Sequence, residues 1–181
     1  WKGFKQSPYN GVCCNMNARQ RTPIKKQVDE FAKTDYILLA STWERDTMIA
    51  RGIDPKKIKI IPFTADCERF KPLNHGNRRF NVCLGGNESI RKGYPYAREA
   101  CQSIHVPLDI LKGFKFEEMP RELNKYTVCL APTVEDGYPH QVLCSMAAGL
   151  VPIVSTYNGV RDLIKDGVNG FIIDLYAQDI E

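Results

Sequence analysis

The sequence contains no apolar run long enough to span a membrane, no secretory-type amino terminus and few histidines. Its three histidines, His75, His105 and His140, are scattered and form no ligand pair. We therefore expect a cytoplasmic protein without a metal site. Attachment to the cytoplasmic face of a membrane, through an amino-terminal part that this chain lacks, stays open.

The sequence also lacks a marked charge excess and any cysteine pattern of the metal-binding type. Lys and Arg number 25 against 21 Asp and Glu, and a net charge of +4 is too small to argue for nucleic acid. Seven cysteines are an odd number in a chain too large to need disulfide staples, so we expect reduced thiols. Cys13 and Cys14 are adjacent rather than spaced as C-x-x-C. With 181 residues, 43% of them hydrophobic, the chain can bury an ordinary core.

The most informative stretch runs from Ala131 to Gly149. A short apolar strand ends before Pro132, and the loop that follows contains the turn residues Glu135-Asp136-Gly137. From His140 onward the spacing of Val142, Leu143, Met146 and Ala147 predicts a helix, with Pro139 tolerated at its first turn. Another apolar strand follows Gly149, so we expect a parallel βαβ unit. The free N–H groups at this helix start could hold a diphosphate, although most such units bind nothing.

Further strands and helices are expected on both sides of this unit. The sequence predicts a buried strand at 36–40 and further strands at 59–62, 80–84 and 106–111. Helices are expected from Thr22-Pro23, after Ser41 or Thr42 as N-cap with Met48 and Ile49 facing inward, and around Leu123 and Tyr126. The polar residues at 72–79 predict a hinge. The strand at 80–84 leads into Gly85-Gly86 and then Arg91-Lys92. A glycine turn lets backbone approach a phosphate and a lysine supplies a point charge, but Arg91-Lys92 also fits a solvated helix start.

Two segments resemble the nucleotide-sugar-dependent glycosyltransferases of family 4. The order D-G-Y-P-x-x-x-L-x-x-M-A-x-G-x-P-I-V-S-T from Asp136 onward is similar to that family's E-G-F-P-x-x-x-L-E-A-M-A-x-G-x-P-V-V. The sequence from Ser41 to Pro72 resembles the end of the family's amino-terminal domain. The resemblance implies a GT-B architecture, an α/β fold in which helices flank a Rossmann-like parallel sheet. Residues 1–72 would be a remnant of the amino-terminal domain, and 73–181 the nucleotide-sugar-binding domain, truncated at its end.

The resemblance also implies an activity and a set of site residues. A family 4 enzyme moves a sugar from a UDP- or GDP-sugar to a glycan, lipid-linked glycan or small molecule, retains the anomeric configuration and needs no metal or cofactor. Asp136, at the first glutamate position, is the implied catalytic residue. The other matched positions imply donor contacts by Gly86, Asn87, Arg91, Lys92, Gly113, Phe114, Gly137, Tyr138, Pro139, His140 and Cys144. Phe114 fits packing between layers equally well, and His140 fits an exposed helix start better than an acid–base role.

Two departures from the family pattern keep a second hypothesis open. Asn87 stands where the family has an arginine, and Cys144 where it has the second glutamate, which removes a cation and a bidentate acceptor. The chain could therefore be a catalytically degenerate binding or scaffold module. A nucleic-acid module using Arg19, Arg21 and the two lysines at 25–26 is disfavoured, because interleaved aromatics and RNA-binding motifs are lacking.

Overall fold

The computed structural model describes residues 29–73 and 79–176. The Cys13-Cys14 pair, the basic residues at 19–26 and most of the helix expected from Thr22 lie outside these ranges, as does most of the hinge expected at 72–79.

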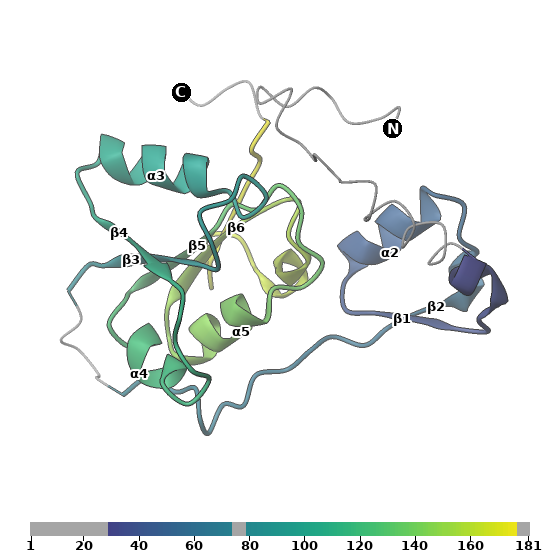
Figure 1. Cartoon of the computed structure of the whole chain (residues 1–181), viewed down its shortest axis with the longest axis horizontal. Helices are drawn as coiled ribbons and strands as arrows, with labels where there is room; N and C mark the ends of the chain where they lie inside the picture. The colour runs from purple at the N-terminus through teal and green to yellow at the C-terminus, as the bar shows by residue number, and fades with distance from the viewer. Residues whose placement is uncertain (1–28, 74–78, 177–181) are drawn as a thin grey trace.

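A five-stranded parallel sheet forms the centre of the fold (Figure 1). Its strands are β3 (Val82–Gly85), β4 (Leu108–Leu111), β5 (Val128–Ala131), β6 (Val151–Ser155) and β7 (Phe171–Ile173). They lie in the order β4-β3-β5-β6-β7, and each neighbouring pair is parallel. The chain is thus α/β with a parallel sheet flanked by helices, which confirms the predicted fold class.

The helices cover both faces of this sheet. Figure 1 shows α3 (Tyr94–Ser103) on one face and α4 (Met119–Leu123) and α5 (His140–Ala147) on the other, and a 3-10 turn, η2 (Gly159–Leu163), follows β6. From β3 the chain moves outward to β4 and then returns to the opposite side of β3 to form β5. The strand order therefore reverses between β3 and β5, and in open parallel sheets ligands bind beyond the carboxyl ends of the strands at such a point.

The core lies between the sheet and α4 and α5, as the apolar pattern predicts. On α5, Val142 and Leu143 are buried, and Met146 and Ala147 pack partly buried against the core. The helix predicted to contain both Leu123 and Tyr126 is shorter than expected, because α4 ends at Leu123 and Tyr126 lies buried in the turn before β5.

A smaller βαβ unit precedes the large sheet. β1 (Ile37–Leu39) pairs in parallel with β2 (Ile58–Ile60), and α2 (Thr42–Ile49) and the 3-10 turn η1 (Pro55–Lys57) connect them. Ser41 is the N-cap of α2 and its hydroxyl accepts a bond from the Glu44 N–H, as predicted. The prediction of a fully buried first strand is wrong, because Leu38 is 64% exposed. The inward placement of Met48 and Ile49 is met only in part: α2 has no fully buried residue, Met48 is half-buried and Ile49 is 36% exposed.

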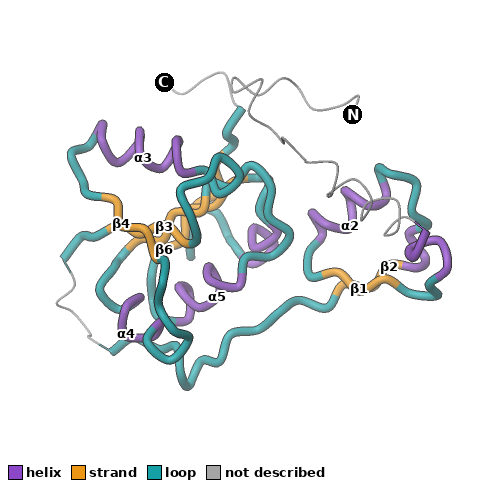
Figure 2. The backbone as a smooth tube through the Cα atoms, in the orientation of Figure 1, coloured by secondary structure: helices purple, strands orange, loops and turns teal. Residues whose placement is uncertain are grey.

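The long connection between β2 and β3 joins the two sheets (Figure 2) and packs against the second one. Phe70 is 1% exposed and packs edge-on against Phe116, with ring centroids 5.5 Å apart. The Asn124 side chain accepts a bond from the Leu73 N–H at 2.8 Å and donates to the Lys71 carbonyl at 3.0 Å. The expected domain boundary at residue 72 stays a prediction.

The expected reduced thiols are confirmed where the structure describes them, since Cys67, Cys83, Cys101, Cys129 and Cys144 are all free. Within the same ranges, no helix is long and apolar enough to cross a membrane.

Candidate functional site

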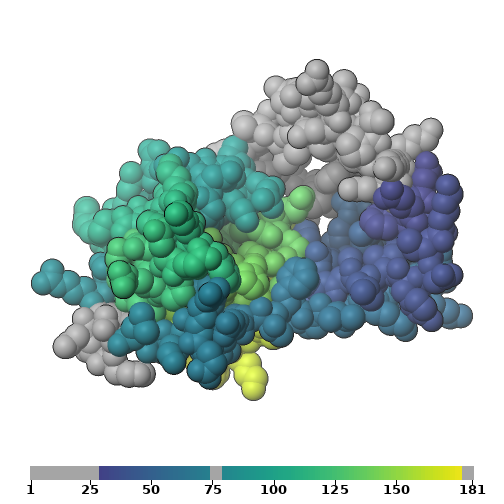
Figure 3. Space-filling view, turned by 60° about the horizontal axis from the view of Figure 1, so that its bottom comes forward, coloured from purple at the N-terminus to yellow at the C-terminus, as the bar shows by residue number. Residues whose placement is uncertain are grey.

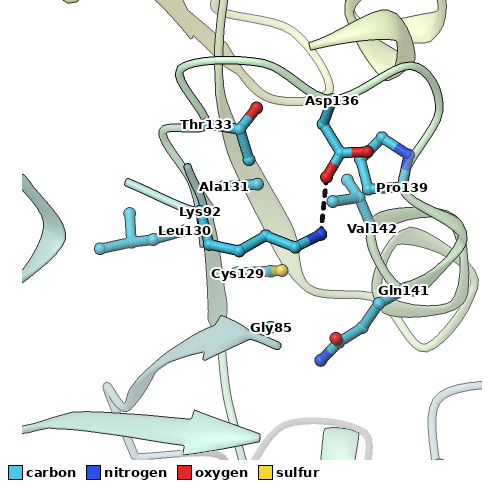
Figure 4. Close-up of a pocket in the computed structure, with 10 residues that line it drawn as sticks. All are labelled: Gly85, Lys92, Cys129, Leu130, Ala131, Thr133, Asp136, Pro139, Gln141 and Val142. Carbon is cyan, nitrogen blue, oxygen red and sulfur yellow. Dashed lines mark hydrogen bonds and ion pairs between the residues drawn. The ribbon is translucent and has the colours of Figure 1, made fainter. Parts of the chain in front are cut away.

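Lys92 and Asp136 meet at the point where the strand order reverses. Lys92 lies in the loop after β3 and Asp136 in the loop after β5, and the Lys92 Nζ is 2.6 Å from Asp136 Oδ2 (Figure 4). The two side chains are 22% and 13% exposed. Arg91 approaches the same carboxylate oxygen at 3.9 Å and donates to the Glu135 carbonyl, but it is 55% exposed. The loops after β3 and β5 therefore converge at this point.

Gly93 allows Lys92 to reach this position. Its φ of 75° lies in the left-handed region, and a Cβ at this residue would lie 1.8 Å from the Pro132 carbonyl oxygen. The loop after β3 can therefore pack against the end of β5 only because residue 93 has no side chain.

A cavity of about 30 Å³ lies beside the ion pair. Its lining comes from the end of β3, from β5 and its loop, and from the first turn of α5: Gly85, Lys92, Cys129, Leu130, Ala131, Thr133, Asp136, Pro139, Gln141 and Val142. A volume of this size corresponds to about one water molecule. The cavity is therefore small, and Lys92 brings a cation to its lining.

The amino-terminal end of α5 faces this region without a side-chain cap. Pro139 is the N-cap residue, one position before the first turn in which the sequence analysis placed it. The first turn contains no acidic residue. Because the first N–H groups of a helix have no partner within it and carry the positive end of the helix dipole, this end favours an anion.

Gln141 lines the cavity and was missed as a side-chain contact. Its amide packs on the Cα of Gly85, where a Cβ would lie 2.2 Å from the Gln141 Oε1. Its Nε2 is buried and makes no hydrogen bond. The sequence signal that could have found it is the glycine that ends β3, since this leaves room for a side chain from the neighbouring loop.

Cys144 and His140 lie next to each other but outside the cavity lining. Cys144 is 3% exposed, and burial raises the pKa of its thiol to about 11, so the thiol is neutral. Its Sγ lies 3.6 Å from the His140 Nδ1, and the His140 Nε2 lies 3.1 Å from the Thr64 carbonyl. The exposed His140 is thus held between α5 and the connection that joins the two sheets.

The remaining predicted donor contacts lie at the same sheet edge without lining the cavity. Gly86, with φ of 104°, packs against the Lys92 stem, and Asn87 is exposed. Gly113 follows β4 with φ of 80° and open space around it, and Phe114 beside it is 40% exposed. The large exposure of Phe114 disfavours the alternative that it packs between layers.

The amino-terminal unit lies against the part of the chain that holds the large sheet (Figure 3), and Ser41 and Glu44 contact Gly137 in the loop that contains Asp136. The Ser41 hydroxyl donates to the Gly137 carbonyl at 2.9 Å, and the Thr42 N–H donates to Asp162 Oδ2 at 2.6 Å. The Glu44 carboxylate packs on Gly137 so closely that a Cβ there would lie 2.1 Å from its Oε1. We call these contacts of Ser41, Thr42 and Glu44 the amino-terminal contact. The sequence analysis identified Ser41 and Thr42 only as helix caps.

Tyr138 extends the amino-terminal contact on the side of the connection. Its ring is 7% exposed, packs edge-on against Phe63 at 5.9 Å and does not line the cavity. Burial and the nearby Asp162 carboxylate raise the pKa of Tyr138. Any contact of Tyr138 with a ligand in the cavity would therefore come from its backbone.

In the part of the chain that the structure describes, no three His, Cys, Asp or Glu side chains lie close enough together to bind a metal ion. The expectation that the protein needs no metal stays a prediction.

Comparisons with known proteins agree on one family. A family model described as "Glycosyl transferases group 1" matches residues 68–180. The UDP-Gal:alpha-D-GlcNAc-diphosphoundecaprenol alpha-1,3-galactosyltransferase of Escherichia coli is 25% identical over 165 aligned positions, which take in 68% of this chain and 43% of that enzyme.

Solved structures show the same fold at low identity. Sucrose-phosphate synthase from Thermosynechococcus elongatus superposes with a TM-score of 0.69 at 14% identity, covering 93% of this chain and 52% of that one. HepE of Anabaena, in complex with UDP-glucose, gives 0.66 at 16% identity, with coverages of 85% and 54%. The chain thus spans about half the length of the relatives that it matches. Because the family match takes in more than half of its residues, the chain belongs to the group 1 glycosyl transferases and has their GT-B type of fold.

Proposed function

We propose that this chain is the donor-binding part of a glycosyltransferase that moves a sugar from a UDP- or GDP-sugar to an acceptor with retention of configuration. The observation that carries the proposal is the position of Lys92. It lies where the strand order reverses, beside the uncapped amino-terminal end of α5.

Sugar transfer from a nucleotide requires stabilisation of the charge that develops on the leaving diphosphate. Lys92 supplies a cation and α5 supplies unpaired N–H groups for that purpose. The Asp136 carboxylate is the partner of Lys92 at 2.6 Å. A diphosphate competes for the ammonium group, and Asp136 is then available to accept hydrogen bonds from hydroxyls of the donor sugar. Because Asp136 would then contact the donor sugar, we propose it as the catalytic residue.

The names of the relatives support a UDP-sugar as the first donor to test. The E. coli relative is named for UDP-Gal and a lipid-linked acceptor, and HepE is described with UDP-glucose. For this chain we infer a glycan or lipid-linked glycan as acceptor, a reaction without a metal, and a cytoplasmic location. Residues 1–72 and 73–181 are the proposed amino-terminal remnant and donor domain.

Calorimetric titration with UDP, GDP, ADP and their sugar conjugates tests this proposal, with EDTA present to exclude metal. We expect one nucleotide series to bind, and Lys92→Ala to weaken that binding about tenfold or more, because a hydrogen bond to a charged group is worth roughly 1.5–3 kcal/mol. Lys165→Ala removes the same charge from an exposed position and is the matched control. Equal affinities of the Lys92 variant and the wild type would refute the proposal.

One observation favours the second candidate, a binding or scaffold module without donor affinity. Cys144 stands at the second glutamate position, where it is buried and neutral and its sulfur faces His140 rather than the cavity. On this reading no nucleotide binds the wild type at millimolar concentration. The same titration therefore separates the two candidates.

A further inference from the structure

Gln141 brings an unsatisfied polar group to the cavity. Its Nε2 is buried and makes no hydrogen bond, and Gln141 is one of the residues that line the cavity beside Lys92 (Figure 4). A buried amide donor without a partner is costly, and native proteins rarely keep one without a reason.

The surroundings of Gln141 hold its amide in this position. The group packs on the Cα of Gly85, and any side chain at residue 85 would collide with it. The Ser145 hydroxyl donates to the Gln141 carbonyl at 2.9 Å, which fixes the backbone of the first turn of α5. The amide therefore stays at the end of β3, with Lys92 across the cavity and the amino-terminal end of α5 beside it.

The chemistry of these three groups points to one kind of ligand. A lysine ammonium, the free N–H groups of a helix end and a side-chain NH2 are all donors, and together they suit an acceptor with several negatively charged oxygens. The cavity of about 30 Å³ takes roughly one water or one phosphate oxygen. A phosphate oxygen in this place would accept the hydrogen bond that Gln141 Nε2 lacks.

We propose that the Gln141 side-chain amide is a donor-binding group that hydrogen-bonds a phosphate oxygen of the nucleotide diphosphate. This inference rests on the proposed function and deepens it, because it assigns a phosphate contact that the sequence analysis did not identify. Asn87 stands where the family pattern has an arginine, and Gln141 supplies a neutral donor next to Gly85. The contact recognises phosphate and is indifferent to the base.

Gln141→Met tests the assignment because methionine has a similar length and shape without a donor. We expect it to weaken binding of the preferred nucleoside diphosphate about tenfold and to leave the affinity of the corresponding nucleoside unchanged. We also expect a higher midpoint of thermal unfolding, because the variant no longer buries an unpaired amide. A residue with a merely structural role would not raise stability while lowering affinity for phosphate.

Gln141→Glu adds a second test, with Gln102→Glu on the exposed face of α3 as the control of equal charge. The carboxylate at 141 repels the phosphate, so the loss of diphosphate affinity should exceed that of Gln141→Met, whereas the control binds like the wild type. Unchanged or tighter diphosphate binding by Gln141→Met would overturn the inference while leaving the proposed function standing. If the wild type binds no nucleotide, both are overturned.

Discussion

Replacement of Gly159 by alanine should displace the loop that contains Asp136. A Cβ at residue 159 would lie 1.7 Å from the Gly137 carbonyl oxygen and 2.5 Å from the Ser41 Oγ. Ordinary non-bonded contacts lie near 3.5 Å, so the Gly137 carbonyl must move by roughly 1.8 Å and the Ser41 hydroxyl by about 1 Å. The backbone cannot rotate away freely, because the Gly159 N–H donates to the Asp136 carbonyl at 3.0 Å and the Asp136 N–H donates to Tyr157 at 3.1 Å.

The magnitude follows from the contacts that break. Overpacking typically costs 1–3 kcal/mol, and each of the two hydrogen bonds at risk, Ser41 to Gly137 and Gly159 to Asp136, is worth about 1 kcal/mol. We expect the free energy of unfolding to fall by about 2–4 kcal/mol. Donor affinity should fall as well, because Asp136 and the Lys92 that pairs with it lose their common position.

Urea denaturation and nucleotide titration of the variant measure both effects. Gly167→Ala is the matched control: its φ of 71° makes alanine unfavourable by roughly 1–2 kcal/mol, but nothing lies within 4 Å of the added Cβ. The control should lose stability and keep its donor affinity. A Gly159→Ala variant that binds nucleotides like the wild type would refute the argument that this glycine holds the Asp136 loop in place.

Two further predictions concern buried groups around the site. Asn158 is fully buried, accepts a hydrogen bond from the Val160 N–H and donates to the Ala131 carbonyl and the Thr133 hydroxyl. Asn158→Ala should lower the free energy of unfolding, measured by urea denaturation, by about 2–3 kcal/mol. A loss below about 0.5 kcal/mol would contradict its role as a helix cap and as a link between the two strand ends. Because burial raises the pKa of Cys144 to about 11 from 9.0, the unfolded chain releases this proton first. The contribution of Cys144 to the free energy of unfolding should be fully present below pH 9 and should be lost between pH 9 and 11, by at most about 1.4 kcal/mol per pH unit. The free energy of unfolding of Cys144→Ala should fall less over this pH range. Parallel pH-stability curves for the variant and the wild type would contradict the prediction.

Much of the sheet could be predicted because its signals are local. Short apolar runs bounded by glycine and proline identified the strands that became β3 to β6, and the spacing of Val142 and Leu143 identified α5. The resemblance implied that Lys92 and Asp136 belong to one donor site, and the observed topology explains why they meet, since the carboxyl ends of adjacent parallel strands lie at one edge. Burial of β1 and α2 could not be predicted, because the pattern does not say whether a neighbouring element covers them.

The contacts between residues far apart in the chain could not be predicted from the sequence. Ser41 and Gly137 are 96 positions apart, and no local pattern shows that a helix cap also donates to a distant loop. Gln141 has the ordinary appearance of a polar residue in a first helical turn, and its unpaired amide is visible only once Gly85 lies beside it. The inward position of Cys144 depends likewise on how α5 rotates against β5.

The location of a bound diphosphate tests the central claim most directly. The 20.6 kDa chain suits amide chemical-shift mapping by NMR during titration with the nucleoside diphosphate that it prefers. We predict that the largest shifts fall on the backbone amides of His140 and Gln141 and on the Lys92 loop, with the Gln141 side-chain NH2 shifting in parallel. Shifts confined to other parts of the chain would contradict the assignment of the donor site to the carboxyl ends of β3 and β5.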